Sequence, residues 1–130
     1  MPLNEDLEAF RLTVRARAAA RIAPFVERLD REQKYSPELW SELREIEVFG
    51  LPFPLSVGGL GASFLAFIVV TEEIARIGAA AALYPGTTVQ VGMTVLEHGS
   101  SEQVDRLVPA MVRGDAPVAW AFTEAQTGSD

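Results

Sequence analysis

The residues best suited to chemistry lie near the end of the chain, where a strand-like stretch runs into a polar turn. Thr123 and Ser129 supply hydroxyl groups there, and Gly128 supplies a backbone without a Cβ atom. Because no side chain shields a glycine, main-chain groups can approach a ligand closely at such a position. The pattern indicates a turn that lies against a flat, polar ligand. We expect the rest of its site to come from polypeptide beyond Asp130.

The stretch that leads into this turn has a period of two. Val118, Trp120 and Phe122 alternate with small or polar residues, which is typical of a β-strand. One strand is not stable alone, because its backbone groups need partners. We therefore expect residues 117–130 to hold the first strand of a following β domain, with Trp120 and Phe122 either against a ligand or in the core of the new sheet.

Residues 1–116 are predicted to form a helical bundle, so the fold class is mainly α. Apolar residues recur there at intervals of three and four, as on the buried face of a helix. The first predicted helix covers residues 5–33, and Pro24 either kinks it or begins a second helix. Four more helices are expected, each between a residue that favours a helix start and residues that end it. They run from Ser36-Pro37 to Gly50, from Ser63 to the small residues 78–84, from Pro85 to Gly99, and from Ser100 to Gly114. Ser100 and Gln103 have the spacing of a capping box.

The charge distribution excludes one class of function. The formal net charge is −7, and residues 35–130 hold four basic and twelve acidic side chains, against seven and six in residues 1–34. No basic face remains for phosphate groups, so the chain is not predicted to bind nucleic acid. The acidic surplus also disfavours an anionic membrane surface.

The composition is that of one folded domain. The 130 residues are 48% hydrophobic and include no cysteine, which excludes thiolate chemistry and zinc–thiolate sites. The single histidine, His98, cannot build a histidine metal site, and we expect it to interact with the carboxyl end of its helix. The N-terminus lacks the pattern of a signal peptide, and the longest apolar run, 64–70, is too short to span a bilayer. We expect a cytoplasmic protein.

Three other groups have a structural and a functional interpretation. Gly58–Gly61 lacks the preceding strand and following lysine of a phosphate-binding loop, so a structural turn is favoured. Adjacent helical residues do not face each other, so Glu72 and Glu73 are interpreted as helix structure, with Glu72 paired to Arg76, rather than as paired catalytic carboxylates. The arginines of the first helix are expected to form a solvated face rather than an anion site; they are Arg11, Arg15, Arg17 and Arg21.

Taken in order, these motifs resemble the N-terminal part of the acyl-CoA dehydrogenase family of flavoproteins. The resemblance extends from about Leu7 to Asp130 and depends on the combination of motifs, since each alone is weak. They are the glycine loop 58–61, the helix with Thr71-Glu72-Glu73-Ile74-Ala75-Arg76, the segment His98-Gly99-Ser100-Ser101-Glu102-Gln103, and the ending Thr123-Glu124 with Gly128-Ser129-Asp130.

The resemblance implies a fold and an activity. Members have an N-terminal helical domain, a middle β domain and a C-terminal four-helix domain. They bind FAD and oxidise an acyl-CoA thioester to the 2,3-enoyl-CoA, and the electrons usually pass to an electron-transfer flavoprotein. The catalytic base of the family is a glutamate of the C-terminal domain, so residues 1–130 alone are expected to be inactive. The family also suggests dimers or tetramers.

The same resemblance implies roles for particular residues. Thr123 would bond the polar end of the flavin, Gly128 would let the backbone approach it, and Ser129 would contact both the cofactor and the CoA portion of the substrate. Trp120 and Phe122 would lie beside the ring. In the family, the helix at the position that follows Tyr84 forms a wall of the acyl pocket. The resemblance therefore implies that Gly86, Thr87 and Gln90 line this wall.

Two positions depart from the family pattern. Ala125 stands where proline often follows the glutamate, and Thr127 stands where a small residue often precedes the glycine. Neither change removes a hydrogen-bond donor. They leave open an alternative function, in which the chain belongs to a non-catalytic partner subunit or a structural domain of a mixed oligomer.

Overall fold

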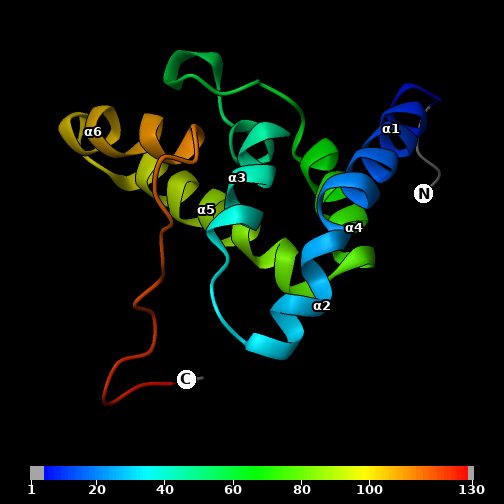
Figure 1. Cartoon of the computed structure of the whole chain (residues 1–130). Coiled ribbons are helices and arrows are strands. Elements are labelled where there is room, and N and C mark those ends of the chain that lie inside the picture. Colours follow the sequence, from blue (N-terminus) through cyan, green and yellow to red (C-terminus); the bar gives the residue numbers. More distant parts are fainter. Residues whose placement is uncertain (1–4, 129–130) are drawn as a thin grey trace.

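The computed structural model describes residues 5–128, which form six α-helices and two short 3-10 helices (Figure 1). The prediction of a mainly α, helical N-terminal domain is confirmed. The elements in chain order are α1 (Glu5–Arg21), α2 (Ala23–Glu32), α3 (Pro37–Glu45), η1 (Val48–Gly50), η2 (Leu55–Val57), α4 (Phe64–Ile77), α5 (Ala79–His98) and α6 (Ser101–Val112).

The first predicted helix is two helices. α1 ends at Arg21, and α2 begins at Ala23 with Pro24 in its first turn. Proline is well tolerated in a first turn because its missing N–H has no partner there in any case. Ile22, at the junction, is fully buried. Of the two interpretations of Pro24, the start of a second helix is therefore confirmed.

The predicted helix starts at serine are confirmed by hydrogen bonds. The Oγ atom of Ser36 accepts from the Leu39 N–H at 3.2 Å, and that of Ser63 accepts from the Ala66 N–H at 3.1 Å. At α6 both bonds of the capping box form: the Gln103 N–H donates to Ser100 Oγ at 3.3 Å, and the Ser100 N–H donates to Gln103 Oε1 at 2.8 Å. Each bond satisfies a donor that the helix cannot pair internally.

Two helix boundaries differ from the prediction. Pro85 does not begin a helix but lies inside α5, which starts at Ala79. Ala81 and Ala82 are buried, and alanine has the highest helix propensity, so the helix continues through the proline with one backbone bond fewer. α3 ends at Glu45 rather than at Gly50, because Glu47 adopts a left-handed conformation with φ of 57°.

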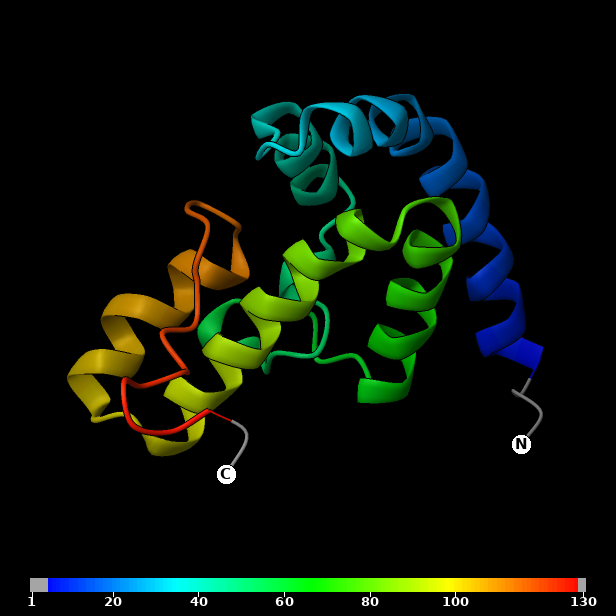
Figure 2. The same cartoon turned by 90° about the horizontal axis from the view of Figure 1, so that it is seen from below.

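Three pairs of helices make the main contacts: α1 packs against α4, α4 against α5, and α5 against α6 (Figures 1 and 2). The rings of Trp40 and Phe49 stack in the core with centroids 4.4 Å apart. Phe53, which belongs to the irregular segment before α4, is also fully buried. Its ring lies so close to Gly92 of α5 that a Cβ atom there would be 2.6 Å from it. Glycine therefore allows this segment to pack onto α5.

The glycine-rich loop is a structural turn, as expected. Gly58 and Gly61 have φ of 86° and 64°, a region that favours glycine. A Cβ atom on Gly59 would overlap the main chain of Phe53. The backbone N–H of Gly59 donates to the Pro54 carbonyl at 3.0 Å. These requirements explain the glycines without any bound phosphate.

The strand predicted over residues 117–123 is not formed. These residues are extended, but within residues 5–128 no strand is present to pair with them. The segment leaves the end of α6 and runs past the helices as the orange-to-red trace of Figure 1. Alternation of side chains predicts an extended backbone, whereas a strand also needs a neighbour for its N–H and C=O groups.

Candidate functional site

A groove of about 680 Å³ lies between α4 and α5. This volume is within the range of small-molecule pockets. Phe64, Phe67 and Thr71 line it from α4, and the α5 side includes the three residues predicted to wall an acyl pocket, Gly86, Thr87 and Gln90. The structure therefore brings all three predicted wall residues to one surface.

The groove has an open, apolar character. A Cβ atom added to Gly86 would meet nothing within 4 Å, so this position faces free space. The rings of Phe64 and Phe67 lie 5.6 Å apart on the opposite wall. One hydroxyl of the wall is already bonded within its helix, because Thr71 Oγ1 donates to the Phe67 carbonyl at 2.8 Å. Such a wall suits a flexible hydrocarbon group better than a polar one.

Ion pairs around the buried Glu73 side chain link α4, one wall of this groove, to α1. The Glu73 side chain is 1% exposed. It accepts two bonds from Arg15, from Nε at 2.8 Å and from Nη2 at 3.0 Å, while Arg11 and Arg76 lie within 3.9 Å and 3.8 Å. The bonds from Arg15 hold the pKa of Glu73 below its ordinary value, against the opposing effect of burial.

The arginines of α1 form the solvated face that the sequence predicts, because Arg15, Arg17 and Arg21 are exposed and Arg11 is partly buried. In addition, Arg11 and Arg15 face a buried carboxylate. Arg15 is hydrogen-bonded to the Glu73 carboxylate and Arg11 is ion-paired with it. Arg21 donates to Glu42 at 2.9 Å. The sequence indicates that the Glu73 side chain is buried, because Glu73 falls on the same helical face as Val70 and Ile77. A carboxylate on an apolar face requires a basic partner.

Glu72 and Glu73 point to different surroundings, as expected of adjacent helical residues. Arg76 Nη2 donates to Glu72 Oε1 at 3.4 Å, and the Glu72 side chain is 51% exposed. The predicted pair of Glu72 and Arg76 is confirmed. With Glu73 committed to Arg15, these carboxylates do not form a catalytic pair.

Four of the five predicted flavin contacts lie on the segment that follows α6. Trp120 is 39% and Phe122 75% exposed, and their rings meet edge to face with centroids 6.0 Å apart. Thr123 is exposed, and a Cβ atom added to Gly128 would meet nothing within 4 Å. The fifth, Ser129, lies outside the described residues.

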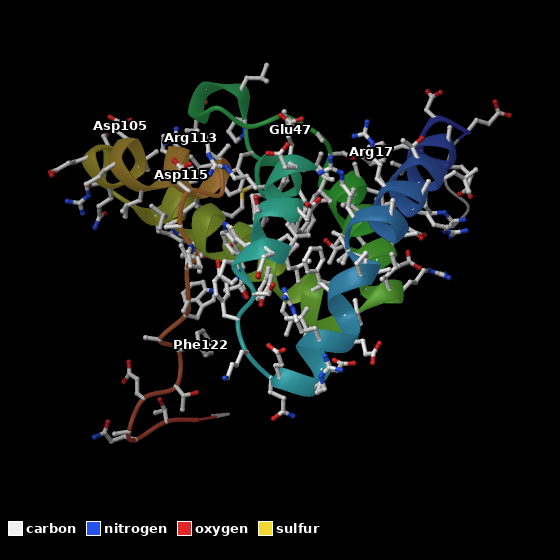
Figure 3. All side chains as sticks on the ribbon, in the orientation of Figure 1. Arg17, Glu47, Asp105, Arg113, Asp115 and Phe122 are labelled. Carbon is white, nitrogen blue, oxygen red and sulfur yellow. The ribbon has the colours of Figure 1, made fainter. Side chains whose placement is uncertain are left out.

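The segment forms the predicted polar turn but does not reach the groove. The Glu124 N–H donates to the Thr127 carbonyl at 3.2 Å. None of the described residues after α6 lines the groove, and Figure 3 shows Phe122 on the trailing segment, away from α4. Two exposed rings, a free hydroxyl and an unshielded backbone fit one side of a flat aromatic cofactor such as a flavin. The opposite side would have to come from other polypeptide.

Comparison with known proteins identifies the family. The profile of the acyl-CoA dehydrogenase N-terminal domain matches residues 4–115. The chain is 30% identical over 131 residues to a 3-(aryl)acrylate reductase of Clostridium sporogenes, covering 100% of this chain and 35% of that protein. It is 29% identical over 131 residues to the mitochondrial isovaleryl-CoA dehydrogenase of Bos taurus, covering 98% and 31%. The chain thus spans about a third of the length of these relatives.

A solved structure supports the same assignment. The chain superimposes on a glutaryl-coenzyme A dehydrogenase in complex with glutaryl-CoA with a TM-score of 0.88 and 29% identity, covering 100% of this chain and 34% of that one. In the part of the chain that the structure describes, no helix is long and apolar enough to cross a membrane. The profile match, which covers most of the chain, shows that it belongs to the acyl-CoA dehydrogenase family and carries the N-terminal domain of that family.

Proposed function

We propose that this chain is the N-terminal part of an FAD-dependent acyl-CoA dehydrogenase, which oxidises an acyl-CoA thioester to the 2,3-enoyl-CoA. The observation that supports this most is the apolar groove between α4 and α5, lined by Gly86, Thr87 and Gln90, in a chain of this family. In this proposal the groove is one wall of the acyl pocket.

The groove residues would hold the acyl chain by burial of apolar surface. Phe64 and Phe67 would cover one side of the chain, and the missing side chain at Gly86 would leave it room. Exclusion of water from the hydrocarbon favours binding by about 0.8 kcal/mol per buried methylene group. The groove would thereby fix the direction in which the thioester end points.

The segment after α6 would supply one side of the flavin site. Trp120 and Phe122 would form an apolar wall, and the Thr123 hydroxyl would donate to the polar end of the ring. Gly128 would allow close approach of the backbone, and Ser129 would contact both the cofactor and the CoA portion of the substrate. When bound, FAD would accept the hydride that leaves the β-carbon of the substrate.

The base that removes the α-proton is assigned to a carboxylate beyond Asp130. Glu73 is a poor candidate, because its bonds to Arg15 lower its pKa and its side chain is buried. Glu72 is paired with Arg76, and Glu124 belongs to the turn. The complete protein would pass its electrons to an electron-transfer flavoprotein and would form an oligomer.

The test is a flavin spectrum of the complete protein, followed by a panel of acyl-CoA thioesters with an artificial electron acceptor. We expect visible flavin absorbance that corresponds to about one FAD per chain and that bleaches on addition of a substrate. Residues 1–130 alone should show no turnover. A complete protein that carries no flavin would contradict the proposal and favour the alternative suggested by Ala125 and Thr127, a non-catalytic partner subunit.

A further inference from the structure

The chain is hydrogen-bonded to α3 at the point where it leaves the helical body. Trp40 Nε1–H donates to the Gly114 carbonyl at 2.8 Å in a buried position. Arg44 Nη2 donates to Asp115 Oδ1 at 3.0 Å, and Arg113 donates to Oδ2 from Nε at 2.9 Å, with its Nη2 at 2.7 Å. We call these contacts the exit anchor. In Figure 3, Arg113 and Asp115 lie together where the trailing segment begins.

The exit anchor joins parts that are far apart in the sequence. Trp40 and Arg44 belong to α3, and Trp40 also stacks on Phe49 in the core. Gly114 has φ of 65°, and a Cβ atom there would be 2.6 Å from the Phe49 ring. The turn after α6 therefore packs tightly against the aromatic core. A side chain at position 114 would have to displace the Phe49 ring or the turn itself.

The described residues beyond Asp115 have no comparable attachment. Over residues 116–128 the hydrogen bonds and ring contacts are internal to the segment: the Glu124 N–H with the Thr127 carbonyl, and the ring of Trp120 with that of Phe122. The exit anchor is thus the last hydrogen-bonded attachment of the described chain to the helical body.

We propose that Trp40, Arg44 and Asp115 are positioning residues, which set the flavin-contacting segment 117–128 at a defined place relative to the groove of α4 and α5. This inference rests on the proposed function, in which one half-site holds the acyl chain and the other holds the flavin. Hydride transfer depends on the distance between the two bound groups, and small misplacements cost large factors in rate. The exit anchor lies on the route of chain that joins the two half-sites.

The principal test uses Asp115→Ala in the complete protein, with two readouts. Amide hydrogen exchange over residues 117–128 should become at least about tenfold faster, because the root of the segment is released. In the dehydrogenation of acyl-CoA, kcat should fall by about tenfold while KM for the substrate stays within about twofold, because alignment is lost and the groove is intact. Asp115→Glu keeps the carboxylate and should restore part of kcat.

A matched control removes a surface carboxylate elsewhere. Glu27→Ala breaks the contact of Glu27 Oε1 with Arg31 Nη1, 3.7 Å apart on α2, and should change neither readout. Trp40→Phe tests the same inference independently, because it removes the donor to the Gly114 carbonyl while keeping an aromatic ring. It should also lower kcat more than it raises KM.

The outcomes separate the two proposals. Unchanged exchange over residues 117–128 and unchanged kcat in both Asp115→Ala and Trp40→Phe would overturn the role of the exit anchor, as would an effect confined to KM. If the wild-type protein itself shows no flavin or turnover, the proposed function fails, and the exchange measurement still decides whether the exit anchor holds the segment.

Discussion

The groove between α4 and α5 and the segment after α6 are the two parts of the proposed site, and they differ in how the rest of the molecule holds them. The groove has two walls, and α4 is fixed to α1 by the buried Glu73 cluster. The segment 117–128 exposes Phe122 to 75% and makes internal contacts beyond its exit anchor. The residues that line the groove belong to two helices of this chain, whereas segment 117–128 would need other polypeptide to complete the proposed flavin site.

The difference follows from how helices and strands pair the N–H and C=O groups of their backbones in hydrogen bonds. A helix pairs its N–H and C=O groups within itself, so α4 and α5 need only side-chain packing to meet. A strand pairs with another strand, and none is present among residues 5–128. In the proposed function, the flavin site therefore depends on strand pairing with other polypeptide, whereas the groove depends only on the packing of two helices.

The largest expected effect concerns the support of the groove. Glu73→Ala should lower the free energy of unfolding of residues 1–130 by about 2–3 kcal/mol, because it leaves the guanidinium groups of α1 without their shared carboxylate. This loss is smaller than for a fully buried pair, because the Arg15 side chain is 44% exposed and water screens the interaction. Urea denaturation followed by circular dichroism measures it.

The matched control is Glu72→Ala, which removes an exposed carboxylate one residue away. It should cost about 0.5 kcal/mol or less. Equal losses for the two variants would show that the Glu73 cluster does not hold α4 to α1, and the groove would then be no better supported than the segment after α6.

The next effect separates two glycines of α5. Gly92→Ala should destabilise by about 1–3 kcal/mol, because its Cβ atom would lie 2.6 Å from the Phe53 ring. Gly86→Ala should stabilise by about 0.5–1 kcal/mol, since it adds helix propensity and enters free space. Thermal unfolding gives both values. A loss of stability in Gly86→Ala would mean that this position does not face an open groove.

The same position tests the groove as a substrate site in the complete protein. Gly86→Phe should fill the groove while leaving the fold intact. We expect kcat/KM for the acyl-CoA with the longest chain that the wild type accepts to fall by about tenfold or more, and that for the shortest to change little. A uniform change across chain lengths would contradict the assignment of the groove to the acyl chain.

Acid should weaken the groove support in a defined pH range. The pKa of Glu73 is lowered from an ordinary value of 4.5 by its bonds to Arg15. Its contribution to stability is therefore complete above pH 4.5 and is lost as the pH falls through the lower, folded-state pKa. The difference in unfolding free energy between the wild type and Glu73→Gln should shrink below about pH 4.5. A difference independent of pH from 7 to 3 would contradict this.

The smallest effect on stability should come from the segment after α6. Phe122→Ser should change the unfolding free energy of residues 1–130 by about 0.5 kcal/mol or less, because the ring is exposed. In the complete protein the same change should weaken FAD binding by about threefold or more, as measured by flavin release on dilution. A large loss of stability in residues 1–130 would show that the segment packs on the helices.

Sequence patterns predicted the helices better than the contacts between them. The caps at Ser36, Ser63 and Ser100 were predictable because each depends on bonds between residues three apart. Pro85 was misplaced because its local preference for a first turn was overridden by the buried alanines before it. The groove residues Gly86, Thr87 and Gln90 were expected from family resemblance, which the helical period alone does not provide.

Some features could not be predicted because they join distant residues. Arg15 and Glu73 are 58 positions apart, and Trp40 and Gly114 are 74 apart. A charged residue on an apolar helix face indicates that the charge needs a partner. Which residue is that partner depends on which helix faces the tertiary structure brings together. The strand over residues 117–123 was predicted from alternation, and the absence of a paired neighbour in the described residues left it extended.

Local rules along the chain thus specified where helices begin and end and which faces are apolar, because those features depend on interactions within one or two turns. The groove, the Glu73 cluster and the exit anchor arose from packing between helices, since each needs side chains from separate elements at distances of a few ångströms. The helices of this chain therefore supply one wall of the proposed acyl pocket. In the proposed function, segment 117–128 would have to pack against other polypeptide to form the flavin site.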